Sequence, residues 1–422
     1  MYDEADTRAA RSHPTMTEPD RSNPFKGVAS PTLHRIILLT DRLAEMSGVG
    51  QAVFVASCTA LVTLVWGAVL DLFMAGLIIA SINLFFTLSD WAGLVLLIRH
   101  KRSFGPVASG LIAFGGIRCL FTLLMALLAA RPFLASTLMV VGHLALTSFM
   151  LNSMWGEPFR LGVTRLTYRS PKLDRRPPLR ILHLTDFHVE RLTRREARAL
   201  ALIDELRPDL IVYTGDLLSF SYIDDPIAQA ECRSLMARLH APLGVYAITG
   251  TPLVDTGPAV QNVLGGLDNI ILLRDAMVSP RQHAGLTIIG VTCTHNSAID
   301  SARLEQLIAG LPLDAYILLL YHAPDLMPEA AKVGVDLVLC GHTHGGQIRL
   351  PGIGALFTSS HYWKRYEMGE YRVGNTIMYV SRGIGMEGKG MPRMRFLCEP
   401  EIELIELRGT LAAEESLREK VR

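Results

Sequence analysis

Two histidines separated by a single residue, His342 and His344, come one glycine after the apolar residues 338–340. Glycines stand on both sides of the pair, and they allow the backbone to turn tightly there. Imidazole nitrogens are common metal ligands, and two histidines at a strand end or turn can address adjacent ions. Taken alone, this pattern fits a metal-binding loop and a solvated loop equally well.

Three other apolar runs of the chain also end in aspartate or histidine. Asp186 and His188 come after residues 181–184, Asp216 after residues 210–213, and His322 after residues 318–321. The ends of such strands converge on one crevice in an α/β sheet. We therefore expect four loops to bring six side chains together, namely Asp186, His188, Asp216, His322, His342 and His344.

The order of these motifs, Asp-x-His, Gly-Asp, His and Gly-His-x-His, resembles the calcineurin-like metallophosphoesterases over about residues 160–408. The resemblance implies a two-sheet α/β sandwich with flanking helices and a site for two divalent ions. It assigns Asp186, His188 and His344 to the first ion, His322 and His342 to the second, and Asp216 to a bridge between them. Asp186, Asp216 and His342 are the expected catalytic residues. Oxygen and imidazole ligands suit Mn, Fe or Zn, and two such ions provide a hydroxide for attack on a phosphoryl group.

The chain departs from the family pattern after its third strand. The family carries Gly-Asn-His-Asp there, whereas this chain has Gly250, Thr251 and Pro252. Thr251 replaces a metal-binding asparagine, Pro252 replaces the histidine that assists the transition state, and Asp255 matches the motif's acid only after a two-residue slip. Two hypotheses are consistent with this departure. The protein is an active phosphoesterase, or it is a catalytically weakened membrane protein that binds metal or phospholipid and has a regulatory role.

Arginines near the end of the chain are candidate phosphate contacts. Arg382 comes after an apolar run and Arg393 lies in a basic group, and arginine binds phosphate with two parallel hydrogen bonds. Solvated loop charges are the alternative interpretation. The tract 382–400 also resembles the membrane-attached branch of the family, which includes UDP-2,3-diacylglucosamine pyrophosphatases of lipid A synthesis. This resemblance implies hydrolysis of a phosphodiester or pyrophosphate in a lipid-linked substrate.

The apolar residues gather in the first part of the 422-residue chain. Four runs, 52–70, 72–98, 107–130 and 133–155, are long enough to cross about 30 Å of hydrocarbon. Two charged residues, Asp90 and Arg118, fall inside these runs. They could pair between helices, but we favour the interpretation that Asp90 lies near an interface. The net charge of +1 argues against nucleic acid as a partner.

Loop charges predict the orientation in the membrane. Arg99, Lys101 and Arg102 come after the second run, and a basic stretch, 156–179, comes after the fourth. By the positive-inside rule both ends of the chain lie in the cytoplasm, so we predict a multi-pass protein of the inner (cytoplasmic) membrane whose catalytic domain faces the cytoplasm. Six scattered cysteines without CxxC spacing suit the same reducing compartment.

We therefore expect an α/β protein with an N-terminal four-helix transmembrane region. Strand-like and helix-like segments alternate from residue 180 onward, which is typical of a layered α/β fold. The predicted order is a disordered tail and interfacial helix (1–50), a transmembrane region (51–155), a basic linker with an edge strand (156–179), a metallophosphoesterase domain (180–408) and a charged tail (409–422).

Overall fold

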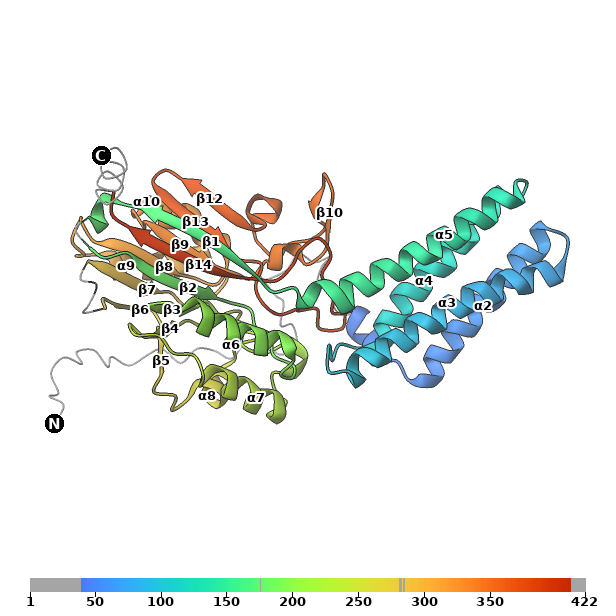
Figure 1. Ribbon diagram of the computed structural model, residues 1–422, viewed down its shortest axis with the longest axis horizontal. Helices are drawn as coiled ribbons and strands as arrows, with labels where there is room; N and C mark the ends of the chain where they lie inside the picture. Colours follow the sequence, from blue (N-terminus) through green and yellow to red (C-terminus); the bar gives the residue numbers. More distant parts are fainter. Residues whose placement is uncertain (1–38, 175, 281–282, 284, 411–422) are drawn as a thin grey trace.

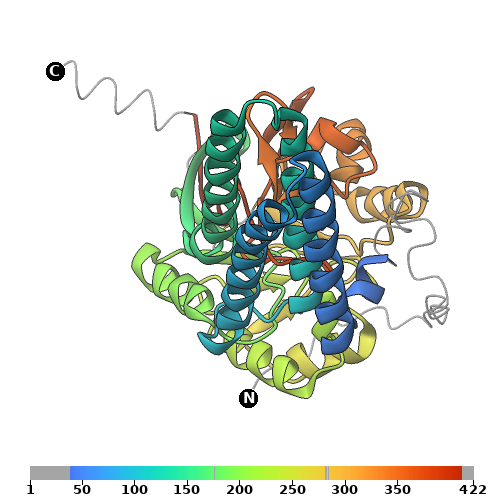
Figure 2. The ribbon, with the colours of Figure 1, turned by 90° about the vertical axis from the view of Figure 1, so that its right-hand side faces the viewer.

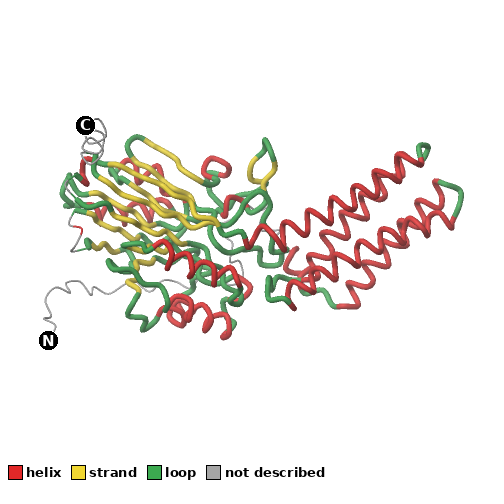
Figure 3. The backbone as a smooth tube through the Cα atoms, viewed as in Figure 1, coloured by secondary structure: helices red, strands yellow, loops and turns green. Residues whose placement is uncertain are grey.

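The computed structural model describes residues 39–410, apart from 175, 281–282 and 284. The described chain has two parts, a bundle of long helices and an α/β domain, which lie end to end (Figure 1). Strands occur only beyond the bundle, as the colouring in Figure 3 shows for the described residues. The predicted disordered tail, the first part of the predicted interfacial helix and nearly all of the charged C-terminal tail fall outside the described residues, whereas residues 39–44 are helical.

Four helices in the described part of the chain are long and apolar enough to cross a membrane. They run side by side over one end of the α/β domain, which lies behind them in Figure 2. The prediction of four apolar helices is therefore confirmed. Further helical turns extend the last of them to Phe159, beyond the predicted end at residue 155. The helices are α2 (Gly48–Val69), α3 (Phe73–Arg99), α4 (Val107–Met125) and α5 (Pro132–Met150).

The two charged residues inside the bundle form an ion pair. Nε of Arg118 lies 2.6 Å from Oδ2 of Asp90, and neither side chain is exposed. The same guanidinium contacts Nδ1 of His143 at 3.1 Å and Oγ1 of Thr147 at 2.7 Å. Our interpretation that Asp90 lies near an interface is wrong, because α3 continues to Arg99 and buries Asp90 against α4. Pairing removes the high cost of an isolated charge in hydrocarbon.

The α/β domain contains two six-stranded sheets and a short two-stranded ribbon. The first sheet has the order β1-β14-β2-β3-β4-β5, and the second has the order β12-β13-β9-β8-β7-β6. The strands are β1 (Gly162–Arg169), β2 (Leu179–Leu184), β3 (Leu210–Tyr213), β4 (Val245–Ala247), β5 (Ile270–Leu272), β6 (Ala276–Val278), β7 (Leu286–Gly290), β8 (Tyr316–Leu320), β9 (Leu337–Cys340), β10 (Arg349–Leu350), β11 (Gly354–Ala355), β12 (Gly369–Val373), β13 (Thr376–Val380) and β14 (Glu401–Arg408).

The apolar faces of the two sheets pack against each other. Ile181 and Val212 of the first sheet belong to the same buried cluster as Ile288 and Leu318 of the second. Helices cover the outer faces, and their apolar residues complete two further cores. The predicted two-sheet α/β sandwich is confirmed. The covering helices are α6 (Arg194–Leu206), α7 (Pro226–Met236), α8 (Gly257–Leu264), α9 (Ser297–Ile308) and α10 (Met327–Lys332).

Two elements begin at other places than the sequence pattern predicted. We expected a helix from residue 302, but α9 begins at Ser297, because the side chain of Asn296 accepts hydrogen bonds from the backbone N–H groups of Ala298 and Ile299. We expected the last strand from residue 396, but β14 begins at Glu401. Phe396 instead bridges to Ile348, outside the main sheets.

Candidate metal centre

Each of the six predicted ligands lies just beyond the carboxyl end of a parallel strand. Asp186 and His188 come after β2, Asp216 comes after β3, and β2 and β3 pair in parallel in the first sheet. In the second sheet β8 and β9 pair in parallel; His322 comes after β8, and His342 and His344 come after β9. The two sheets meet at this edge, where the backbone N–H of His342 donates to the carboxylate of Asp186. The structure therefore brings the six side chains together, as expected.

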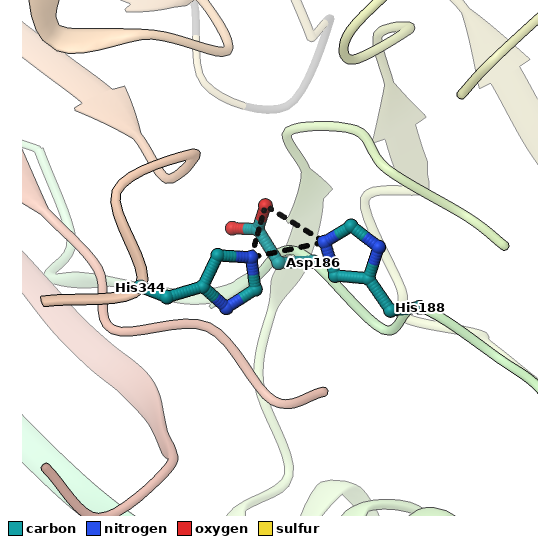
Figure 4. Close-up of side chains that lie close together, drawn as sticks. All are labelled: Asp186, His188 and His344. Atoms are coloured by element: carbon teal, nitrogen blue, oxygen red, sulfur yellow. Dashed lines mark hydrogen bonds and ion pairs between the residues drawn. The ribbon is translucent and has the colours of Figure 1, made fainter. Parts of the chain in front are cut away.

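The first group consists of Asp186, His188 and His344, and all three side chains are buried (Figure 4). Nε2 of His188 lies 2.9 Å from Nε2 of His344. Oδ1 of Asp186 lies 3.7 Å from the first of these nitrogens and 3.5 Å from the second. Three ligand atoms from three side chains thus face one point.

The second group consists of Asp216, His322 and His342, whose ligand atoms all lie within 4.8 Å of one another. Oδ2 of Asp216 lies 3.3 Å from Nε2 of His322. The hydroxyl oxygen of Thr251 reaches the same place, at 3.3 Å from Oδ2 of Asp216, 3.2 Å from Nε2 of His322 and 3.4 Å from Nδ1 of His342. Thr251 therefore adds a neutral oxygen to this group.

The two groups meet at Asp216. Its Oδ2 atom lies 3.5 Å from Nε2 of His188 in the first group, in addition to its contact with His322 in the second. One carboxylate oxygen thus faces ligand nitrogens of both groups. This is the geometry that a bridging ligand between two ions requires.

The backbone is strained at this edge of the sheets. Five of the six residues adopt left-handed backbone angles, with φ between +44° and +69°, and His322 is the exception. Residues other than glycine rarely adopt such angles, and they persist at functional sites where the surrounding structure enforces them. The strain indicates that the fold holds these side chains for a purpose other than its own stability.

Burial and neighbouring charges divide the imidazoles of each group into one neutral and one cationic ring. In the first group, burial lowers the pKa of His344 to about 3, whereas hydrogen bonds with Asp186 and Glu387 outweigh burial and raise the pKa of His188 well above its usual value. In the second group, burial lowers the pKa of His342, whereas Asp216 outweighs burial and raises the pKa of His322 to about 10. In each group one imidazole is therefore protonated, which indicates that a positive charge is favoured at that place.

The donor set fits divalent metal ions. Each group offers carboxylate oxygen and imidazole nitrogen, a combination that suits Mn, Fe and Zn. Among the described residues, Nε2 of His342 is a buried polar atom without a hydrogen-bond partner, and its other nitrogen, Nδ1, faces Thr251 in the second group. Nδ1 is accordingly the nitrogen of His342 that points toward the centre.

Residues 250–255 depart from the family motif, but they still hold Asp216 in place through hydrogen bonds. The carboxylate of Asp255 accepts hydrogen bonds from the backbone N–H groups of Gly250, Asp216 and Leu217, at 2.7 to 2.9 Å. Burial and the nearby Asp216 raise the pKa of Asp255 to about 6. A side chain at Gly250 would collide with Asp216, since its Cβ would lie 2.2 Å from Oδ1 of that residue. Pro252 belongs to the turn between Thr251 and Asp255, in which the carbonyl of Thr251 accepts from the N–H of Asp255.

The two predicted phosphate-binding arginines are already paired. Arg382 lies 2.7 Å from Glu401 and is one-quarter exposed. Arg393 is buried, and its Nε lies 2.7 Å from Oε1 of Glu190. Its Nη1 donates to the carbonyls of Lys389 and Met391, and its Nη2 donates to the hydroxyls of Ser219 and Ser221. Arg382 borders solvent, whereas Arg393 would have to leave all of these partners to reach a phosphate.

Two residues near the centre were not predicted from the sequence. Oε2 of Glu387 lies 3.1 Å from Nδ1 of His188, and the ring of His295 lies 5.0 Å from the ring of His342. His295 comes after β7 much as the ligands come after their strands, and this position was a signal that could have identified it. Glu387 lies within the tract 382–400, but it does not follow a strand and had no such signal.

Known proteins resemble part of the chain. No family model matches it. The metallophosphoesterase YkuE of Bacillus subtilis is 31% identical over 271 residues, which are 60% of this chain and 88% of YkuE. The chain belongs to the metallophosphoesterase family.

Other metallophosphoesterase relatives are more distant. Phosphodiesterase YaeI of Escherichia coli is 28% identical over 237 residues, which cover 56% of this chain and 84% of YaeI. The UDP-2,3-diacylglucosamine pyrophosphatase LpxG of Chlamydia trachomatis is 26% identical over 304 residues, which cover 59% of this chain and 90% of LpxG. Metallophosphoesterases are hydrolases, and family membership together with the two groups supports a centre for divalent metal ions.

Proposed function

We propose that the protein is a membrane-anchored hydrolase in which two divalent ions cleave a phosphodiester or pyrophosphate bond of a lipid-linked substrate. Asp186, His188 and His344 would hold the first ion, and His322 and His342 the second, with Thr251 beside it. The position of Asp216 carries the proposal, because one of its oxygens faces His188 at 3.5 Å and His322 at 3.3 Å. No single-ion site needs such a carboxylate between two groups.

The residues of the chain would divide the work between them. The bound ions would supply an activated water and neutralise the charge on the phosphoryl oxygens. Asp216 would fix the separation of the ions, and the backbone N–H of Thr251, which donates to Oδ1 of Asp216 at 2.7 Å, would hold that carboxylate in place. Arg382 borders solvent and would contact the phosphate after releasing Glu401.

The membrane region supports a lipid-linked substrate. The ends of α3 and α5 and the start of α4 lie at the side of the α/β domain (Figure 1). The basic residues Arg99, Lys101 and Arg102 lie at this end, and cations near a bilayer attract anionic headgroups at about 1 kcal/mol each. Because LpxG is a UDP-2,3-diacylglucosamine pyrophosphatase, that compound is our specific candidate. The positive flank also supports an inner membrane location with the domain in the cytoplasm.

Hydrolysis by the purified full-length chain tests the proposal. We would supply Mn²⁺ and compare UDP-2,3-diacylglucosamine with simple phosphodiesters, using Asp216→Asn as the inactive control. Cleavage of the lipid-linked compound by the unmodified chain alone would support the proposal. Binding of two ions without cleavage of any substrate would favour the alternative, a weakened metal-binding protein with a regulatory role.

Labelling in intact cells tests the orientation separately. A cysteine introduced at Thr410 should resist a reagent that cannot cross the membrane and should react after the cells are opened. Reaction in intact cells would place the α/β domain outside the cytoplasm and would overturn the predicted topology.

A further inference from the structure

The segment 387–393 lies between the first metal group and the membrane region. At its start, Oε2 of Glu387 lies 3.1 Å from Nδ1 of His188 and accepts the backbone N–H of Phe220 at 2.7 Å. Its other oxygen accepts the N–H groups of Gly388 and Lys389, at 2.6 and 2.9 Å. Four hydrogen-bonding groups therefore fix the carboxylate of Glu387.

The middle of the segment contacts the helical turn that precedes α2. The ammonium group of Lys389 pairs with the carboxylate of Asp41. Gly390 packs so closely on the backbone of Thr40 that an added Cβ would lie 2.4 Å from its carbonyl. Residues 40 and 41 belong to the helical turn at 39–44, just before the first membrane helix.

The end of the segment contacts the loop between α3 and α4. Arg393 pairs with Glu190, whose other carboxylate oxygen accepts the backbone N–H of Phe104 at 3.0 Å. Gly105 packs on the side chain of Arg393. The turn before α2 and the loop between α3 and α4 thus both contact a segment that begins beside a predicted metal ligand.

When a histidine binds a metal ion through one ring nitrogen, the hydrogen-bond partner of its other ring nitrogen fixes the orientation of the ring. Nδ1 of His322 faces the backbone carbonyl of Thr214, the residue that directly follows β3, at 2.8 Å. Nδ1 of His188 faces the carbonyl of Leu218 at 3.2 Å and also the carboxylate of Glu387. The first group is therefore sensitive to the position of segment 387–393, whereas His322 is held by the backbone next to β3.

We propose that Glu387 is a positioning residue for His188, and that segment 387–393 couples the first metal group to the membrane helices. The inference rests on the proposed function, since it takes His188 as a metal ligand. Contacts with Asp41 and with the α3–α4 loop hold the segment in the place from which Glu387 orients the imidazole. The membrane region then sets the affinity of the first group for its ion, in addition to anchoring the domain.

Mn²⁺ alone is the probe for the first part of the inference, with the full-length chain in lipid nanodiscs. Glu387→Ala should weaken binding of one ion by about 10- to 100-fold and leave the other unchanged. The electron paramagnetic resonance spectrum at limiting Mn²⁺ should change from that of a coupled pair of ions to that of an isolated ion. The affinity of Glu387→Gln for this ion should lie between those of the unmodified chain and Glu387→Ala. Glu370→Ala is the matched control, because it removes a carboxylate that pairs with the exposed Arg372.

A charge exchange tests the coupling to the membrane region. Asp41→Lys and Lys389→Asp should each weaken binding of the first ion several-fold, and the double variant should recover it because the pair re-forms with reversed sign. A double variant as weak as the single ones would overturn the coupling. Two ions bound equally well by the unmodified chain and Glu387→Ala would overturn the positioning role alone, whereas no ion bound by the unmodified chain would overturn the proposed function.

Discussion

The hydroxyl oxygen of Thr251 lies 3.2 Å from Nε2 of His322, at the place where the family pattern has an asparagine. The substitution therefore does not leave the second group open. It exchanges an amide oxygen for a shorter hydroxyl, which reaches the group because its backbone N–H is anchored on Asp216 at 2.7 Å. The second group keeps four side chains with oxygen or nitrogen donors.

Removal of the hydroxyl of Thr251 should weaken binding of the second ion. Thr251→Val keeps the shape of the side chain, and we expect a loss of about 5- to 10-fold in Mn²⁺ affinity, which corresponds to roughly 1 to 1.5 kcal/mol. Isothermal titration calorimetry measures the change. Thr287→Val is the control, because this buried threonine of β7 pairs with Ser279 and not with the metal groups. Equal affinities for Thr251→Val and the unmodified chain would show that the hydroxyl is not a ligand.

Loss of the charge of Asp216 should release both ions. Asp216→Asn removes the carboxylate that faces both groups, whereas His344→Ala removes a nitrogen of the first group only. We expect elemental analysis to find no bound metal in the first variant and one ion in the second. The exposed Asp268→Asn should keep two ions. Unchanged metal content in both site variants would refute the assignment of the ligands.

The affinity for metal should rise with pH. Burial opposes protonation of His322, but the carboxylate of Asp216 raises its pKa to about 10, and a metal ion can bind only the unprotonated ring. Each displaced proton changes the affinity by about tenfold per pH unit below that pKa. Equilibrium dialysis with Mn²⁺ between about pH 6 and pH 9 should therefore show tighter binding at the higher pH. The ring is already cationic in this range, so a flat profile would mean that no proton leaves His322.

Strand periodicity and strand-end residues predicted much of the fold and the placement of the six side chains. An apolar run that ends in Asp or His specifies both a buried strand and the polar side chain at its end, so the run 210–213 predicted β3 with its observed bounds. His183 lies inside the apolar run that became β2, as a core histidine does, and the structure buries it fully between Glu403 and Thr214. Local pattern suffices where the position of a side chain follows from the strand that carries it.

Contacts between distant segments could not be predicted in this way. Glu387 lies about 200 residues from His188 along the chain, and no periodicity links the two. Arg393 resembled a phosphate ligand by residue type, but its burial against Glu190 depends on the packing of segment 387–393. The ion pair of Asp90 and Arg118 could not be predicted for the same reason, because an apolar sequence reveals the helices but not which of their faces meet.

The ion pair of Asp90 and Arg118 should stabilise the bundle. Asp90→Leu leaves a guanidinium unpaired among buried side chains, and loss of one partner of a buried pair typically costs about 3 to 5 kcal/mol. The double variant Asp90→Leu/Arg118→Leu should recover most of this loss. Unfolding in a denaturing detergent measures the difference, and Ser81→Ala on an exposed face of α3 is the control. A single variant as stable as the control would show that the pair contributes nothing.

The last prediction concerns Pro252, which stands where the family has a histidine that assists the departing group. A proline offers no side-chain donor, and such assistance typically contributes about 10²- to 10⁴-fold. An alkoxide needs this proton most, whereas a nucleoside monophosphate departs with little need of it. We therefore expect the protein to prefer pyrophosphates and activated esters to alkyl phosphodiesters.

Restoration of the family residues tests this preference. The turn that contains Pro252 is held by the carbonyl of Thr251, which accepts the N–H groups of Val254 and Asp255, and these bonds do not involve residue 252 itself. Thr251→Asn/Pro252→His should therefore keep the turn and raise hydrolysis of alkyl diesters far more than that of pyrophosphates. Thr251→Asn alone separates the metal contribution from that of the histidine. Equal gains on both classes of substrate, or faster alkyl diester than pyrophosphate cleavage by the unmodified chain, would show that the demand of the leaving group is not what this turn determines.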